Sequence, residues 1–318
     1  MSKILVTGGA GFIGSHLVNS LAKEGHQVVV ADILLRGNKI EKDILSKIEF
    51  HQVDVRNADA MIELSKDCKY IYHFAAVLGV DVVADYPTET MDTEVIGTRN
   101  ICEAALKNGV EKIVYASTSG VYGHSAIEKS VTENIIVDPR TSYAIAKRYN
   151  EIYLKARYEE TGLTSVSLRF FNVYGPNQDE RMVIPRFFKQ ALNNKPITIF
   201  GSGKQTRDFT YIDDTIKACV ILAEKAEGAE IYNIANENEC TIEEIANKIK
   251  QITNSDSEIT YVNSPKKRYD YEVERRYGSS EKLYKVIGYK PSTAIDEGLR
   301  RTYESMLRYS KDSPEHSN

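Results

Sequence analysis

The 318-residue sequence lacks an excess of charge of either sign, because 41 Lys and Arg residues stand against 45 Asp and Glu residues. This balance argues against a general binder of nucleic acids or of anionic membranes. The sequence also lacks an apolar run of transmembrane length and a signal-peptide segment, since Met-Ser-Lys leads directly into a short apolar stretch. We therefore expect a cytoplasmic protein that binds neither nucleic acid nor membrane.

Cysteine is scarce and scattered along the chain. No Cys-x-x-Cys pair and no nearby histidine cluster accompanies the four cysteines, which are Cys68, Cys102, Cys219 and Cys240. This spacing excludes the common zinc-site patterns, so we expect no metal. Isolated cysteines also fit a reduced compartment, where disulfides are rare.

The chain is about twice the length of a typical domain, and its first half alternates short β-branched segments with segments of helical periodicity. This alternation predicts β-α-β units around a parallel sheet, hence an α/β fold. The predicted strands are 3–7, 27–31, 48–53, 70–75, 112–116 and 164–169, and the predicted helices are 12–24, 57–66, 88–108 and 142–161.

Beyond residue 172 the sequence changes to segments punctuated by Pro and Gly, which indicates a second lobe. The helical pattern of residues 212–227 suggests a return to the first lobe. We predict a first lobe of residues 1–173 plus about 206–236, a second lobe of 174–205 and 237–310, and a disordered tail at 311–318.

Residues 7–14, TGGAGFIG, join the first predicted strand to the first predicted helix. Glycines there permit a tight turn and a close approach of the backbone to a pyrophosphate, which sits on the helix N-terminus. Asp32 follows the second strand, where a carboxylate accepts hydrogen bonds from an adenosine ribose and repels the 2′-phosphate of NADP. The pattern favours NAD, although Arg36 offers a positive charge that a 2′-phosphate could use.

Tyr143 and Lys147 are four residues apart at the start of a predicted helix, so they share one face. An adjacent ammonium, together with the positive charge of a bound nicotinamide, lowers a tyrosine pKa toward the range of an acid/base. Residues 115–123, YASTSGVYG, end the fifth strand, where ligands bind in open α/β sheets. Thr118 there can present its hydroxyl to the substrate oxygen that Tyr143 reaches.

These segments resemble the extended short-chain dehydrogenase/reductase family, specifically its nucleotide-sugar epimerases and dehydratases. The resemblance rests on TGGAGFIG, Asp32, Asp54-Val55, HFAA at 73–76, GT at 97–98, STSGVYG at 117–123, YAIAK at 143–147, RFFNVYGP at 169–176 and RDFTYIDD at 207–214. It implies a Rossmann-type doubly wound parallel sheet that binds NAD, with a smaller C-terminal α/β lobe that binds a nucleotide-diphosphate sugar, a UDP-sugar being favoured. It also implies a homodimer paired through helices 88–108 and 142–161.

The resemblance further implies roles for individual residues. Tyr143 would be the acid/base, Lys147 would hold the nicotinamide ribose and tune Tyr143, and Thr118 would share the sugar hydroxyl. The implied cofactor-binding residues are Gly8, Gly11, Phe12, Ile13, Gly14, Asp32, Asp54, Val55, Phe74, Ala75, Ala76, Ser117, Tyr143, Lys147 and Phe170. The implied substrate-binding residues are Thr118, Asn172, Thr198, Phe200, Arg207 and Arg275, with neighbouring arginines as alternatives to Arg275.

Gly120 bears on the reaction. Dehydratases and UDP-glucuronate decarboxylases of the family carry an acidic residue close to the threonine, and this chain has Ser119-Gly120 there. Glycine cannot move a proton, which favours 4-epimerisation through a 4-keto sugar. The alternatives are a UDP-glucuronate decarboxylase or another NAD-dependent nucleotide-sugar oxidoreductase or dehydratase, and a non-catalytic NAD-sensing protein.

Three further residues have competing interpretations. Glu94 stands where the family often has Asn, and we expect it to be an exposed helix residue. His73 ends an apolar strand, which favours a satisfied, partly buried histidine over a catalytic one. Arg181, in a predicted loop, is either solvated or paired with the carboxylate of a uronic acid.

Overall fold

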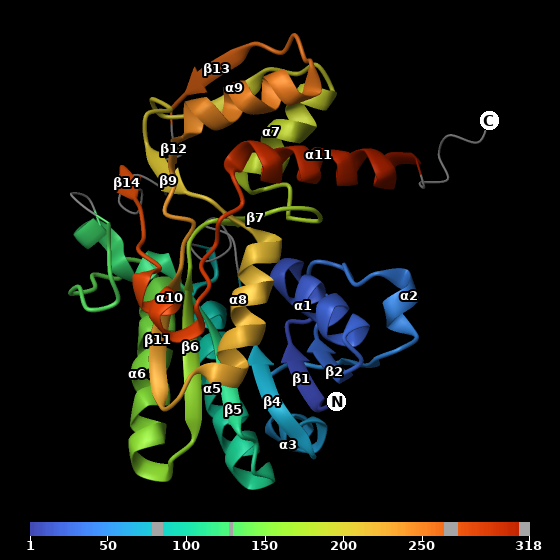
Figure 1. Cartoon of the computed structure of the whole chain (residues 1–318), viewed down its shortest axis with the longest axis vertical. Coiled ribbons are helices and arrows are strands. Elements are labelled where there is room, and N and C mark those ends of the chain that lie inside the picture. The colour runs from blue at the N-terminus through green and yellow to red at the C-terminus, as the bar shows by residue number, and fades with distance from the viewer. Residues whose placement is uncertain (78–84, 127–129, 264–272, 312–318) are drawn as a thin grey trace.

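The computed structural model describes residues 1–77, 85–126, 130–263 and 273–311. It contains a seven-stranded parallel sheet in the order β11-β6-β5-β4-β1-β2-β3 (Figure 1). The strands are β1 (Lys3–Thr7), β2 (Gln27–Asp32), β3 (Glu49–Gln52), β4 (Cys68–His73), β5 (Lys112–Thr118), β6 (Thr164–Phe170) and β11 (Ala229–Ile234). The predicted Rossmann-type sheet is confirmed, and each of its predicted strands ends within two residues of the observed bounds.

Helices cover both faces of this sheet, because successive side chains of a strand point to opposite sides. Ile4 and Val6 pack with α1 (Phe12–Lys23) and α8 (Ile212–Lys225). Leu5 packs on the other face with α3 (Ala58–Leu64), α5 (Pro87–Asn108) and α6 (Ser142–Thr161). A core on each face holds the carboxyl ends of the strands in fixed positions.

The second lobe lies beyond the carboxyl ends of the strands (Figure 1). Its two small sheets are β8 (Ile197–Phe200) with β13 (Ile259–Val262), and β9 (Thr206–Asp208) between β12 (Glu239–Thr241) and β14 (Arg275–Arg276). The helices beside them are α7 (Val183–Leu192), α9 (Ile242–Thr253) and α11 (Ile295–Lys311). The remaining elements are α2 (Lys42–Leu45), the 3-10 helix η1 (Ser119–Ala126), α10 (Glu281–Ile287), and the short parallel strands β7 (Val173–Tyr174) and β10 (Thr210–Tyr211), which pair with each other.

β9 and α10 each pack with the other lobe than the one that the predicted boundaries assign to them. β9 falls within 206–236 but pairs with β12 and β14 of the second lobe. α10 falls within 237–310 but packs on β11 and α8, because Leu283 and Ile287 complete the first lobe's core. α11 runs to Lys311, and the rest of the predicted tail, 312–318, lies outside the described residues.

Two further observations concern the cysteines and the length of the helices. All four cysteines are buried thiols without a disulfide. No helix in the described ranges has the length and apolar character needed to cross a membrane.

Candidate active site

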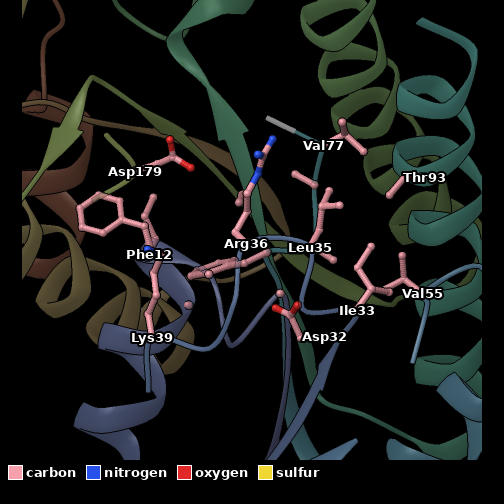
Figure 2. A pocket seen from close by; sticks show the side chains of 18 of the residues that line it. Phe12, Asp32, Ile33, Leu35, Arg36, Lys39, Val55, Val77, Thr93 and Asp179 are labelled. Atoms are coloured by element: carbon pink, nitrogen blue, oxygen red, sulfur yellow. The ribbon is translucent and has the colours of Figure 1, made fainter. Parts of the chain in front are cut away.

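One pocket lies along the carboxyl ends of β1 to β6, and every residue predicted to bind the cofactor lines it. Figure 2 shows Asp32 with Ile33, Leu35 and Arg36 of the segment that follows, while Asp179 reaches the pocket from another element. Lys39 and Arg181 also line this pocket. The structure therefore brings together residues that are far apart in sequence, as the motifs predict.

The glycine loop is shaped for close backbone contact. Gly8 has a φ of +69°, and a Cβ atom there would lie 2.6 Å from the backbone N of Ala75. A Cβ on Gly14 would lie 2.1 Å from the carbonyl oxygen of Gly8. Gly11 caps α1 without a side-chain hydrogen bond. The N–H groups of the first helical turn therefore face the pocket uncapped, an arrangement that fits a dinucleotide pyrophosphate.

The Asp32 carboxylate is fixed at the end of β2. Its Oδ2 accepts a hydrogen bond from the Ala10 N–H at 3.0 Å, and its Oδ1 accepts one from the Leu34 N–H at 2.7 Å. Burial raises the pKa of Asp32, and these backbone donors act against that rise. Asp54 is held differently, because the Arg56 guanidinium donates to both carboxylate oxygens and lowers the pKa of Asp54.

Tyr143 and Lys147 lie on the first turns of α6. Thr141 caps the N-terminus of this helix, because its side chain accepts a hydrogen bond from the Ala144 N–H. The Lys147 Nζ atom lies 5.4 Å from the centroid of the Tyr143 ring. Burial raises the pKa of Tyr143 and the Glu94 charge adds to that rise, while burial lowers the pKa of Lys147. Without a nicotinamide, the pKa of Tyr143 therefore lies above its usual value, opposite to the lowering expected from Lys147.

Glu94 corrects one prediction, because it is fully buried rather than exposed. Its Oε2 atom lies 2.9 Å from Lys147 Nζ and accepts a hydrogen bond from the Tyr115 hydroxyl at 3.2 Å. Asn150 donates to the Tyr115 hydroxyl and to the Glu94 carbonyl. A sequence signal existed, since Glu94 shares a helical face with the buried Thr98 and lies seven residues before the buried Ile101.

His73 is a satisfied core residue, as predicted, although it is fully rather than partly buried. Its Nδ1 atom lies 2.8 Å from the Thr7 hydroxyl and its Nε2 atom 3.2 Å from the Thr98 hydroxyl. Burial lowers the pKa of His73 to about 3. The histidine is therefore neutral and gives no sign of a catalytic role.

Ser117 and Thr118 end β5, and Ser117 lines the pocket whereas Thr118 is not among its lining residues. The Ser117 hydroxyl donates to Glu151 at 2.6 Å, and Glu151 in turn binds Arg169 through two hydrogen bonds of 2.8 Å. The Thr118 hydroxyl accepts a hydrogen bond from the Gly120 N–H at 3.0 Å. The Glu151–Arg169 pair is a buried feature that the motifs do not reveal.

The predicted substrate residues of the second lobe fall into two groups. Asn172 has a φ of +30° and donates to the Asp208 carbonyl, which joins the lobes. Thr198 and Phe200 lie on β8, where the Arg186 guanidinium is 4.6 Å from the centroid of the Phe200 ring.

The predicted substrate arginines lie on neighbouring strands, Arg207 on β9 and Arg275 on β14. Arg275 makes a bidentate ion pair with Glu239. In the register of β14 with β9, Arg276 rather than Arg275 stands opposite Arg207, so those two side chains share one face of the small sheet. Arg181 makes a bidentate ion pair with Asp179 at the pocket edge.

Comparison with known proteins agrees with this geometry. A family model described as the NAD dependent epimerase/dehydratase family matches residues 4–235. The chain belongs to this family. It is therefore an enzyme of the NAD-dependent epimerase/dehydratase class, and its cofactor is NAD.

Relatives within the NAD-dependent epimerase/dehydratase family catalyse different reactions. The chain is 36% identical to a UDP-N-acetyl-alpha-D-glucosaminuronate decarboxylase of Bacillus cytotoxicus, covering 95% of this chain and 97% of that protein. It is 32% identical to a UDP-glucuronate 4-epimerase of Thermodesulfobacterium geofontis, covering 99% of this chain and 98% of that protein. Similarity alone therefore leaves both reactions open.

Solved structures of the family show the same arrangement. A UDP-glucose 4-epimerase of Thermotoga maritima, with UDP-glucose, matches with a TM-score of 0.90 at 32% identity over 97% of this chain and 99% of that chain. A UDP-glucuronic acid 4-epimerase of Bacillus cereus, in complex with UDP-glucuronic acid and NAD, matches with a TM-score of 0.88 at 30% identity. The match covers 96% of this chain and 99% of that chain.

Proposed function

We propose that the chain is an NAD-dependent nucleotide-sugar 4-epimerase acting on UDP-glucose-type sugars, including N-acetyl or uronic derivatives. The observation that carries this proposal is the close contact between Gly120 and Thr118. Gly120 has no side chain that could move a proton, and a Cβ atom there would lie 3.3 Å from the Thr118 hydroxyl oxygen, so Gly120 supplies no second acid/base beside Thr118. Tyr122, also in η1, has its hydroxyl bound to Asn233 and Arg169. Tyr143 is then the acid/base at the sugar.

A single acid/base suffices for 4-epimerisation. Bound NAD would supply a reversible hydride acceptor for C4 of the sugar, so that the hydride could return to the opposite face of the 4-keto sugar. Tyr143 takes the proton of the 4-hydroxyl and gives it back when the 4-keto group is reduced, so no proton or electron pair is lost. Thr118 shares the hydroxyl oxygen, and Lys147 holds the nicotinamide ribose next to Tyr143. The fixed strand ends supply the positioning on which such a reaction depends.

The nucleotide sugar would bind across the second lobe. Thr198 and Phe200 would hold the base, and Asn172 the diphosphate region. Arg207 with Arg276 on the same sheet face would bind the diphosphate, since guanidinium groups suit phosphate oxygens. Arg275 is the less suitable partner because Glu239 occupies its guanidinium.

Decarboxylation is the second candidate, favoured by the 36% identity to the Bacillus cytotoxicus decarboxylase. Both reactions begin by oxidising C4, but a 4-keto uronic acid also loses its carboxylate as carbon dioxide. Arg181 at the pocket edge is a possible partner for such a carboxylate only if it leaves Asp179.

The deciding experiment incubates the protein with UDP-glucose, UDP-N-acetylglucosamine, UDP-glucuronate and UDP-N-acetylglucosaminuronate in turn and follows the products by NMR. We expect interconversion of C4 epimers with at least one of them. Release of carbon dioxide from either uronate, with the matching UDP-pentose product, would favour decarboxylation instead. Bound NAD without turnover of any sugar would favour an NAD sensor.

A matched pair of variants tests the mechanism. Tyr143→Phe removes the acid/base and should lower the rate by about 10²- to 10⁴-fold. Tyr149→Phe removes a hydroxyl from an exposed tyrosine of the same helix and should leave the rate unchanged. Full activity of Tyr143→Phe would refute the mechanism for any substrate.

We also propose that the protein is a cytoplasmic homodimer. Ile145, Tyr149 and Ile152 follow one another at helical spacing on α6 and are 46%, 43% and 54% exposed, and Ile96 on α5 is 38% exposed. α5 and α6 pack together within the chain. A second copy that presents the same two helices would cover these apolar side chains with a self-complementary surface.

A further inference from the structure

The Glu94–Lys147 ion pair is the feature that the proposed reaction does not yet use. Both side chains are fully buried, and their charged atoms are 2.9 Å apart. The second carboxylate oxygen of Glu94, Oε1, has no hydrogen-bond partner among the described residues. A neutral amide at position 94 would leave the Lys147 ammonium buried without its counter-ion, which is costly. The structure therefore keeps a negative charge directly behind the lysine that faces Tyr143.

The charges around Tyr143 nearly cancel. Lys147 on α6 is balanced by Glu94 on α5, and the next buried pair, Glu151 with Arg169, also balances itself while Arg148 approaches Glu151 from the surface. The other titratable groups packed against the pair are the neutral His73 on β4 and Tyr115 on β5, whose ring centroid is 4.7 Å from Lys147 Nζ. Among the described residues, the charge of Lys147 itself is therefore offset by Glu94, while Arg169 and Arg148 share Glu151.

We propose that Glu94 is a positioning residue that holds the Lys147 ammonium beside Tyr143 and offsets its charge, so that Tyr143 loses its proton at a higher pH than it would with a neutral residue at position 94. The inference deepens the proposed function and rests on it for one step, the transfer of the 4-hydroxyl proton to Tyr143. It also agrees with the direction in which the Glu94 charge moves the pKa of Tyr143.

The position of Glu94 would matter for proton transfer at Tyr143. Bound NAD⁺ would supply a positively charged nicotinamide ring beside Tyr143, and NADH would supply a neutral one. Tyr143 would hold the 4-hydroxyl proton between its removal and its return to the oxygen at C4, while Glu94 would offset the charge of Lys147. A neutral residue at position 94 would leave the Lys147 charge uncompensated and lower the pH at which Tyr143 loses its proton.

The first test measures cofactor affinity by calorimetry from pH 6 to pH 10 without any sugar. If NAD⁺ binding favours loss of a proton from the Tyr143–Lys147 pair, NAD⁺ affinity should rise with pH by up to about tenfold per pH unit over part of this range. NADH carries the same adenosine and phosphates, so its affinity is the control and should change little. Equal pH dependence of the two cofactors would overturn the inference. Because no sugar is present, this result is independent of whether the enzyme is an epimerase.

The second test compares variants at position 94. In Glu94→Gln and Glu94→Asn the pH at which NAD⁺ affinity rises should fall by about one unit or more, because one nearby negative charge is gone. The acid limb of kcat against pH should move in the same direction. Glu94→Asp keeps the charge and should restore the native inflection. A Glu103→Gln control on the same helix removes only an exposed pairing with Arg157 and should behave as the native protein.

If NAD⁺ affinity rises at the native pH in both Glu94→Gln and Glu94→Asn, the inference is overturned. Circular dichroism confirms that each variant is folded before the comparison is made. If the neutral variants do not fold, the comparison of NAD⁺ with NADH in the native protein still decides whether proton loss is coupled to cofactor charge.

Discussion

Glu151 provides the sharpest test of how the first lobe is stabilised. The carboxylate is fully buried and accepts hydrogen bonds from Ser117, Arg148 and Arg169, the last through two of its nitrogens. Arg169 is itself only 1% exposed. The substitution Glu151→Gln would leave the Arg169 charge buried without its counter-ion.

The cost follows from the burial of both groups. Breaking a buried ion pair from one side costs about 3–5 kcal/mol, since the remaining charge stays desolvated. In a chain of this size, each kcal/mol lowers Tm by about 2 °C, so we expect a fall of roughly 6–10 °C. Urea unfolding followed by circular dichroism gives the free energy directly.

Two controls separate the buried charge from a general loss of contacts. Glu297→Gln removes an exposed ion pair with Arg300 and should cost less than about 1 kcal/mol. The double variant Glu151→Leu with Arg169→Met removes both charges and should recover much of the lost stability. If Glu151→Gln costs no more than Glu297→Gln, or if the double variant is less stable than the single one, the reasoning is wrong.

Three further predictions concern the cofactor loop, pH and assembly. Gly14→Ala places a Cβ atom 2.1 Å from the Gly8 carbonyl oxygen, so NAD binding measured by calorimetry should be lost, whereas Lys23→Ala, which shortens an exposed side chain at the other end of α1, should bind NAD. His73 is neutral in the fold with a pKa of about 3, so its contribution to stability is complete above pH 6.5 and is lost as the pH falls toward 3. By pH 4.5 the native protein should have lost about 3 kcal/mol of its free energy of unfolding through this group. In urea unfolding, His73→Gln should no longer show this loss, whereas the exposed control His51→Gln should still show it. Ile152→Glu places a charge in the exposed stripe of α6 and should turn a dimer into a monomer in light scattering, while Ile136→Glu, at a more exposed isoleucine outside that stripe, should not. A dimer in both variants would refute the proposed interface.

The sequence predicts the features that follow from local rules. Gly109 ends α5 with a φ of +65°, and the four-residue spacing of Tyr143 and Lys147 puts both on one side of α6. The glycine loop is predictable for the same reason, since its turn and helix start are encoded within eight residues.

Other features depend on contacts between distant segments and escape such rules. The burial of Glu94 is decided by α6 packing on α5, and the roles of Arg275 and Arg276 are decided by the register of β14 on β9. The pKa of Tyr143 depends on both, because it reflects burial and a charge from another helix. A pattern of charged residues cannot specify such pairings before the fold is known.

The position of β11 at the edge of the main sheet has a consequence during synthesis on the ribosome. β6 ends at Phe170 and its partner β11 begins at Ala229, so the intervening residues must be made before the sheet is complete. At about 5–20 residues per second, the outer edge of β6 waits roughly 3 to 12 s for that partner. An unpaired edge strand of a nascent chain is a place where another chain can add. The segment between these two strands, which includes α7 and β8 of the second lobe, therefore sets how long that edge stays unpaired.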